Sequence, residues 1–130
     1  MLLTETQKQL LFNKLKKIML ENKGPLVVSN QLLNEITLIG NKSVPYGSKK
    51  TLIPGMYFAS ATIRKSSIAF YFFPIYGSMN DFEKIIPNTL KLLKGKTCFH
   101  FKNENEIDDS ELRKMFKVGI SGYKKLGWIH

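Results

Sequence analysis

The chain has 130 residues, of which 20 are Lys or Arg and 10 are Asp or Glu, so its formal net charge is +10. A chain of this length buries roughly two-thirds of the surface that its unfolded form exposes, so we expect one domain over residues 1–130 that needs neither disulfides nor a structural metal. An apolar content of 43% and an aromatic content of 12% exclude a disordered tail.

The single cysteine, Cys98, cannot form an internal disulfide, and the first residues lack the positive and apolar regions of a secretory signal. We therefore expect a cytoplasmic, reducing environment. The longest nearly continuous apolar run, residues 68–75, contains Pro74 and is shorter than the roughly 20 residues needed to cross a bilayer. We expect no membrane partner.

Half of the acidic residues lie in the segment 104–111, which contains no Lys or Arg. The positive excess of the remaining chain serves solubility, and it also attracts anionic partners without specificity. The acidic segment offers oxygen ligands but lacks the spacing of a calcium loop, so we predict no metal site there.

The first elements follow from periodicity and from stop signals. Thr4 and Gln7 have the spacing of a capping box, and apolar residues at helical spacing predict a helix over about residues 5–22. Two short strands, 26–28 and 35–39, are expected next. Residues 40–55 hold three glycines, two prolines and three lysines, which predicts a long surface loop that is either functional or merely an insertion.

Residues 56–74 contain two β-rich runs joined by Lys65-Ser66, which predicts a β-hairpin with a two-residue loop. In that register one side pairs Ala59 with Phe72 and Ala61 with Phe70, and it is apolar enough to pack beneath helices. The other side carries hydroxyls, rings and one cation, namely Phe58, Ser60, Thr62, Arg64, Tyr71 and Phe73. A longer loop with a bulge would change which residues pair across the strands, but not which side of the hairpin each residue lies on. We expect the mixed side to stay open.

The remaining elements are a helix, a strand and a final helix. Ser78 with Asp81 predicts a helix that Pro87 interrupts and that finishes by Gly95. Residues 97–101 alternate in polarity, which predicts a strand. The last helix is expected to begin at Asp108 or Asp109 and to bury a stripe from Leu112 to Tyr123.

Cys98 and His100 share one face of the predicted 97–101 strand. Their Cα atoms are expected about 7 Å apart, which we take to be too far for the direct hydrogen bond that activates a nucleophile. We therefore predict a structural cysteine beside a satisfied histidine and no catalytic residue. A Cys/His-based enzyme is the less favoured alternative.

Three runs carry a resemblance to a known family: GMYFASATIRKSSIAFYFFPIYG, LLKGKTCFHF and GYKKLGWI, all within residues 55–129. They resemble the YdhG-like bacterial family of unknown function, whose members typically show a G-K-[ST]-C-x-x-F strand and a closing helix. The resemblance implies a small α+β domain without established catalysis, and it assigns no chemistry to residues 95–99. One branch of the family is described as frataxin-like and iron-delivering, a role that needs an acidic surface and is not carried over to this basic chain.

Together these patterns predict a two-layer α+β domain, an antiparallel sheet flanked by helices, with one sheet face covered by three helical segments. We predict non-enzymatic binding, without a cofactor, of a small anionic or amphipathic ligand or of a second copy of the chain on the open face. The predicted binding residues are Lys49, Lys50, Phe58, Ser60, Thr62, Arg64, Tyr71 and Phe73. The alternative is single-stranded nucleic-acid binding, in which the same rings stack on bases and the cations contact phosphates.

Overall fold

Six strands form one antiparallel sheet and two further strands form a separate hairpin in the computed structural model, which describes residues 3–130. The strands are β1 (Val27–Leu32), β2 (Glu35–Ile39), β3 (Val44–Tyr46), β4 (Thr51–Ile53), β5 (Tyr57–Ile63), β6 (Ile68–Phe72), β7 (Leu93–Lys94) and β8 (Cys98–Phe101). The helices are α1 (Glu5–Asn22), α2 (Met79–Phe82) and α3 (Asp109–Lys125), and the 3₁₀ segments are η1 (Phe73–Ile75), η2 (Thr89–Leu92) and η3 (Glu104–Glu106).

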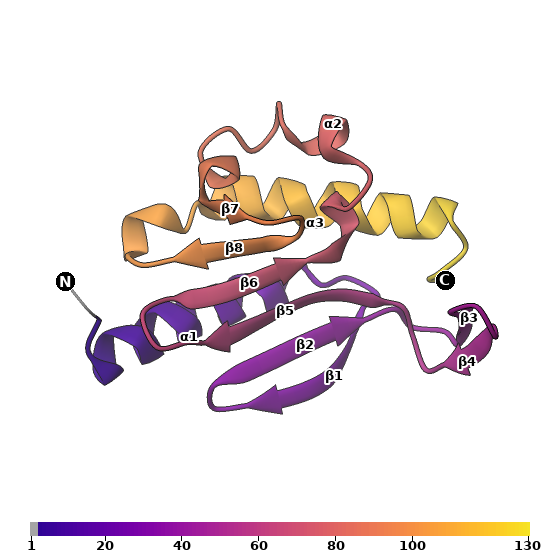
Figure 1. Ribbon diagram of the computed structural model, residues 1–130, viewed down its shortest axis with the longest axis horizontal. Coiled ribbons are helices and arrows are strands. Elements are labelled where there is room, and N and C mark those ends of the chain that lie inside the picture. The colour runs from indigo at the N-terminus through magenta and orange to yellow at the C-terminus, as the bar shows by residue number, and fades with distance from the viewer. Residues whose placement is uncertain (1–2) are drawn as a thin grey trace.

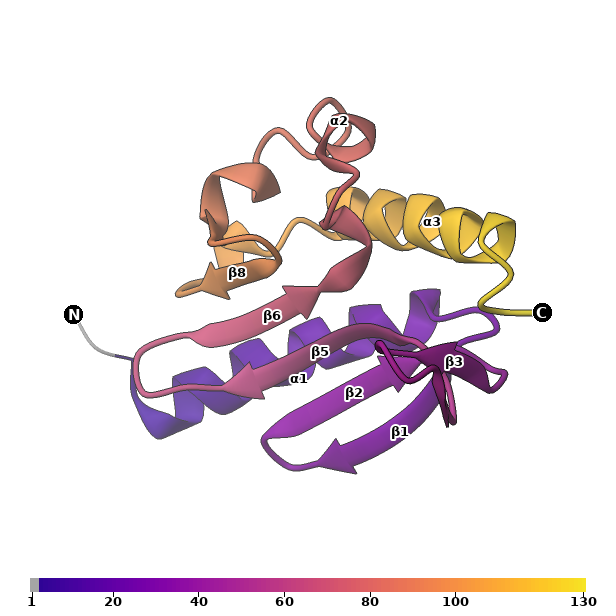
Figure 2. The same ribbon diagram turned by 45° about the vertical axis from the view of Figure 1, so that its right-hand side comes forward.

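The large sheet has the strand order β1-β2-β5-β6-β8-β7, and β3 and β4 pair only with each other. Helices α1 and α3 lie on the same side of this sheet (Figures 1 and 2), so the molecule has a strand layer and a helix layer. The predicted α+β class with an antiparallel sheet is confirmed.

Helix α1 has the predicted bounds. The Thr4 side chain accepts a hydrogen bond from the Gln7 backbone N–H, and the Gln7 side chain accepts one from the Thr4 N–H, so the capping box is complete. The helix ends before Gly24, whose positive φ of 51° turns the chain toward β1.

The core between the layers is built mainly from phenylalanine. Eight of the nine phenylalanines are fully buried, and Phe73 is the exception. Phe70 lies at the centre, with ring centroids 5.9–6.5 Å from those of four neighbours, Phe72, Phe99, Phe101 and Phe116. Ala59 and Ala61 face Phe72 and Phe70 across the strands as predicted, because the small side chains leave space for the rings.

A β-bulge overturns the prediction that Phe58 lies on the open face. The register between β2 and β5 shifts so that Leu38 faces Ala59 while Ile39 faces Tyr57, which leaves Phe58 as the extra residue. Phe58 turns toward the helices, is 0% exposed, and packs against the rings of Phe72, Phe116 and Tyr123. Tyr57 takes its place on the open side.

Two segments differ from their predicted local structure. Residues 40–55 contain the β3–β4 hairpin rather than a plain loop, because short runs with β-branched and aromatic residues flank a turn at Gly47. The helix predicted from Ser78 is reduced to α2 and η2, which lie on either side of Pro87 and are followed by the unpredicted strand β7. Helix α3 begins as predicted, since the Asp108 carboxylate accepts from the Glu111 N–H at 3.0 Å.

Candidate functional site

The open sheet face is the side of the six-stranded sheet that points away from α1 and α3. Figure 1 shows the front of β2, β5 and β6 uncovered, with α1 behind β5 and β6 and α3 above them, behind β7. One row of this face crosses all six strands in register and consists of Asn30, Thr37, Ser60, Tyr71, Cys98 and Lys94. The next row consists of Leu32, Glu35, Thr62, Ala69 and His100. Most of these side chains are polar but uncharged.

Arg64 follows the last residue of β5 and reaches back over this face to Tyr71. Its Nη2 donates a hydrogen bond to the Tyr71 hydroxyl at 2.8 Å, and its Cζ lies 5.9 Å from the centroid of that ring. None of the ion pairs among residues 3–130 involves Arg64. Because a guanidinium carries five N–H donors in a planar fork, the donors not used by Tyr71 can bind an anion.

Lys8 of α1 holds the hairpin end from which Arg64 projects. Its Nζ donates to the carbonyl oxygens of Arg64 at 3.4 Å and Lys65 at 3.1 Å, and it pairs with the Glu5 carboxylate at 2.9 Å. The lysine is buried, and its ammonium tolerates burial because these partners replace water. The helix layer therefore fixes the position at which the Arg64 side chain begins.

The β2 side of the open face carries a hydrogen-bonded carboxylate. Asn30 Nδ2 donates to Glu35 Oε2 at 2.8 Å, and Thr62 Oγ1 donates to Glu35 Oε1 at 3.2 Å. Arg64 and Glu35 thus lie on different sides of Thr62, so an anion is best placed beside Arg64 toward β6 and β8, away from the carboxylate.

Cys98 and His100 approach more closely than the sequence led us to expect. The Cys98 Sγ lies 3.4 Å from His100 Nε2, within hydrogen-bond distance for sulfur, and His100 Nδ1 lies 3.0 Å from Ser67 Oγ. The prediction that the pair is too far apart is wrong, because it used the Cα separation whereas the two side chains lean toward each other. The expectation of a satisfied histidine agrees with these contacts, since both ring nitrogens have partners.

Burial works against activation of the Cys98 thiol. Burial raises its pKa above the ordinary value of 9.0, and the opposing effects of a hydrogen bond with Tyr71 and of the Arg64 charge are smaller. A thiol with a raised pKa is protonated near neutral pH and is a weak nucleophile. The cluster of Cys98, His100 and Ser67 therefore resembles a polar patch more than a catalytic centre.

The structure brings some of the predicted binding residues together and separates others. Ser60, Thr62, Arg64 and Tyr71 share the open face, where Ser60 is only 7% exposed. Half-buried Phe73 lies in η1, beyond the end of β6, with its ring 6.4 Å from that of Tyr57. Lys49 and Lys50 are exposed in the β3–β4 turn, which lies at the opposite end of the sheet from the β5–β6 turn (Figure 1), so they do not join Arg64.

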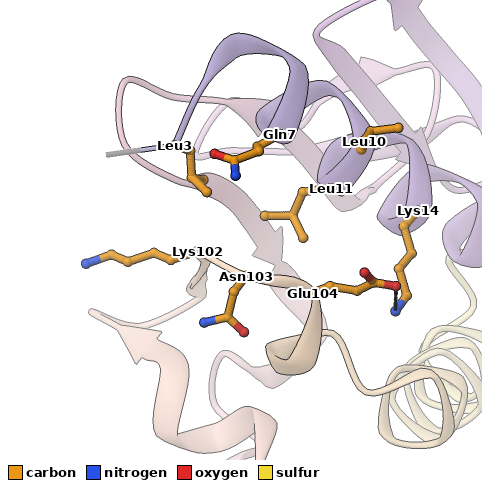
Figure 3. Close-up of a pocket in the computed structure, with 8 residues that line it drawn as sticks. All are labelled: Leu3, Gln7, Leu10, Leu11, Lys14, Lys102, Asn103 and Glu104. Carbon is orange, nitrogen blue, oxygen red and sulfur yellow. Dashed lines mark hydrogen bonds and ion pairs between the residues drawn. The ribbon is translucent and has the colours of Figure 1, made fainter. Parts of the chain in front are cut away.

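Two pockets lie near the sheet and α1. One of about 250 Å³ adjoins the Tyr57 end of the open face and is also lined by Tyr46, Ile53 and Phe73. The other, of about 450 Å³, lies between the first half of α1 and residues 102–104 (Figure 3). There Leu3, Leu10 and Leu11 form the apolar wall, while Lys14 and Glu104 pair at 3.3 Å and Lys102 points away from the other labelled side chains. This second pocket offers no unpaired charge directed inward.

The acidic segment stabilises local structure. Glu106 accepts from the backbone N–H groups of Lys102 and Asn103, and buried Glu111 accepts from those of Asn88 at 3.2 Å and Thr89 at 2.7 Å. No group of three or more potential metal-ligating side chains occurs among residues 3–130. The sequence could not show that Glu111 already has hydrogen-bond partners, because these contacts join segments more than twenty residues apart.

Comparison with protein-family models, with curated proteins and with solved structures found no match. The resemblance to the YdhG-like family therefore stays a prediction. Of the helices in the described part of the chain, none is long and apolar enough to span a bilayer.

Sequence reasoning did not join Tyr57, His100 or Ser67 to the predicted binding face. Tyr57 was assigned to no surface because the bulge could not be foreseen. His100 and Ser67 were separated in the sequence by 33 positions and meet only because β6 pairs with β8. Their one usable signal was the alternation of residues 97–101, which correctly placed Cys98 and His100 on the same face.

Proposed function

We propose that the open sheet face binds a small anionic ligand with an apolar or aromatic part, without catalysis. The guanidinium of Arg64 holds the anionic group, and the Tyr71 ring packs against the apolar part. The hydroxyls of Ser60 and Thr62 and the His100 imidazole border the site and are held by Tyr57, by Glu35, and by Ser67 with Cys98, so they shape its polar edge while Arg64 and Tyr71 make the contacts.

The observation that carries this proposal is that Arg64 is held in position but has no acidic partner among residues 3–130. It is anchored to Tyr71 at 2.8 Å, yet it has no carboxylate partner in the described chain. A guanidinium that is positioned but not neutralised loses little conformational freedom when an anion binds. A cytoplasmic location belongs to the same proposal, because the free thiol of Cys98 is stable in a reducing compartment.

The test uses phenyl phosphate as the probe, with binding followed by amide chemical shifts. We expect the largest changes at residues 62–71 and 98–100. Replacing Arg64→Gln should weaken binding by about 10- to 100-fold, since a hydrogen bond to a charged group contributes about 1.5–3 kcal/mol. Tyr71→Phe, which removes the hydroxyl that positions Arg64, should weaken it by a smaller factor.

The matched control is Arg113→Gln, since Arg113 is the other arginine of the chain and lies exposed on α3, paired with Asp109 at 3.2 Å. This variant has the same change in charge and should bind phenyl phosphate as the parent does. Equal weakening by both variants would mean that only the overall positive charge attracts the probe, and the proposal would fail.

A further inference from the structure

A pocket of about 230 Å³ lies outside the open sheet face, between the C-terminal half of α3, η1 and α2. Its walls are apolar and largely aromatic and include Phe73, Pro74, Phe82, Val118, Tyr123 and Trp128. Phe73 is the one phenylalanine that the core does not fully bury, and exposed Tyr76 and Leu126 continue the apolar surface at the rim. Concave apolar sites of this kind bind small molecules by removing their apolar surface from water.

Two glycines of α3 line the pocket, and packing explains only one of them. A Cβ at Gly119 would lie 2.9 Å from Cζ of Phe58, so the close approach of that buried ring requires glycine. A Cβ at Gly122 would meet nothing within 4 Å, and the backbone there is ordinary α-helix. Alanine at 122 would favour the helix, so neither packing nor backbone conformation requires the glycine. A side chain at 122 would enter open space on the pocket side of α3.

The polar groups of the pocket select the charge of an occupant. Ser78 and Asp81 lie among the lining residues, whereas none of the chain's 20 Lys and Arg residues does. Lys96 lies over the ring of Tyr76, 5.4 Å from its centroid, and lines an adjoining hollow that shares Ser78 and Asp81 with this pocket, but it does not line the pocket itself. Asp81 takes part in none of the ion pairs found among residues 3–130. An apolar pocket with one unpaired carboxylate favours a cation.

We propose that this pocket binds a small molecule that combines a compact aromatic group with a protonated amine. The aromatic group fills the space beside Gly122, and the ammonium pairs with Asp81 and donates to the Ser78 hydroxyl. The site is separate from the one proposed on the open sheet face and has the opposite charge preference, so either proposal can fail without the other.

The experiment compares 4-phenylbutylamine with 4-phenylbutyrate, which share the same phenylalkyl group and differ in the sign of their charge. Trp128 is the single tryptophan of the chain and lines the pocket, so its fluorescence reports occupancy. We expect a saturable change with the amine at millimolar concentration or below, as for a small fragment. The amine should bind about two- to fivefold more tightly than the butyrate, because an exposed ion pair gives a modest gain. Nonspecific attraction to a chain of charge +10 would favour the butyrate instead.

Three variants complete the test. Gly122→Leu places a side chain in the pocket and should abolish the saturable change, whereas Gly122→Ala adds one methyl group and should weaken binding only slightly. Asp81→Asn should remove the preference for the amine. Circular dichroism and thermal unfolding should show that all three fold, since both replacements at 122 favour a helix. The proposal is overturned if the parent chain shows no saturable change, if the butyrate binds as tightly as the amine, or if folded Gly122→Leu binds the amine unchanged.

Discussion

Gly119 and Gly122 lie three positions apart on α3, and a side chain is sterically excluded at the first position but not at the second. Gly119→Ala should lower the free energy of unfolding by about 1–3 kcal/mol, because its Cβ would press on the buried rings of Phe58 and Phe72. Gly122→Ala should raise it by about 0.5–1 kcal/mol, since alanine favours the helix and meets nothing. Urea unfolding of the two variants measures both effects. Changes of the same sign would show that the packing of Phe58 against α3 is not as described.

The buried hydroxyl of Tyr123 makes the stability of the fold depend on pH in alkaline solution. This hydroxyl donates to the backbone carbonyl of Tyr57, and burial raises its pKa above the ordinary value of 10.0. The folded state thus keeps a proton that the unfolded state loses, so the contribution is complete below about pH 10 and falls as the pH rises further. Burial also raises the pKa of Tyr57, which adds to the same trend.

The variant Tyr123→Phe separates the two roles of this residue. At neutral pH it should lower the free energy of unfolding by about 0.5–1.5 kcal/mol through the lost hydrogen bond. Above about pH 10 the loss of stability per pH unit should be shallower than in the parent, by at most about 1.4 kcal/mol. Urea unfolding at neutral and alkaline pH provides the comparison, and identical slopes in both proteins would contradict the burial of the phenol.

Among the elements, the β5–β6 hairpin depends on α1 for the position of its turn. Lys8→Met keeps the apolar stem of the side chain but removes the ammonium that binds the carbonyl oxygens of Arg64 and Lys65. We expect a loss of about 1–2 kcal/mol in the free energy of unfolding, and faster hydrogen exchange at residues 64–68. Lys17→Met, at an exposed position of the same helix, is the control and should change neither quantity measurably. Equal exchange rates in the two variants would mean that Lys8 does not hold the turn.

The register of the β5–β6 hairpin could be predicted from the sequence because Lys65-Ser66 fits a two-residue loop, and the pairs that follow, Ala59 with Phe72 and Ala61 with Phe70, each join a small and a large side chain. The position of Phe58 in the core could not be predicted from the sequence. The bulge that turns Phe58 inward is stabilised by packing against Phe116 and Tyr123, and these residues are far from Phe58 in the sequence. The two strands within residues 40–55 could not be predicted for a different reason. Each has only three residues, which is too short for an alternation of apolar and polar residues to be recognised.

The same distinction applies to the candidate binding face. Ser60, Thr62 and Tyr71 were found from the alternation within one hairpin, which is a local signal. The contacts of His100 with Ser67 and the distance of Lys49 from Arg64 depend on how distant segments meet. The pocket beside Gly122 was not predicted, because its walls come from α2, η1 and α3 together.

At the scale of the whole molecule, one group of exposed positive charges follows helix α3. Exposed cations of α3 are Arg113, Lys114, Lys117, Lys124 and Lys125, whereas the two rows of the open face and the residue that follows β5 supply Lys94 and Arg64. Only three ion pairs occur among residues 3–130, so most cations repel one another. Raising sodium chloride from about 0.02 M to about 0.3 M should therefore raise the thermal midpoint by a few degrees through screening. A lower midpoint at high salt would contradict net repulsion.

This charge distribution also bears on nucleic acids. An oligonucleotide bound through phosphates should lose affinity steeply as salt rises, and charge reversal of the α3 lysines should weaken it more than Arg64→Gln does. Binding that instead follows Arg64 and Tyr71 would favour stacking on the sheet, as in the alternative predicted from the sequence.

Tyr57 connects the two surfaces for which ligands are proposed. Its side chain bonds Ser60 on the open face, while its backbone carbonyl is held by Tyr123, a wall of the aromatic pocket. A molecule that shifts Tyr123 must also shift the strand that carries Ser60. The two sites should therefore be thermodynamically linked: each ligand should change the affinity for the other by the same factor, and Tyr123→Phe should reduce that factor toward one.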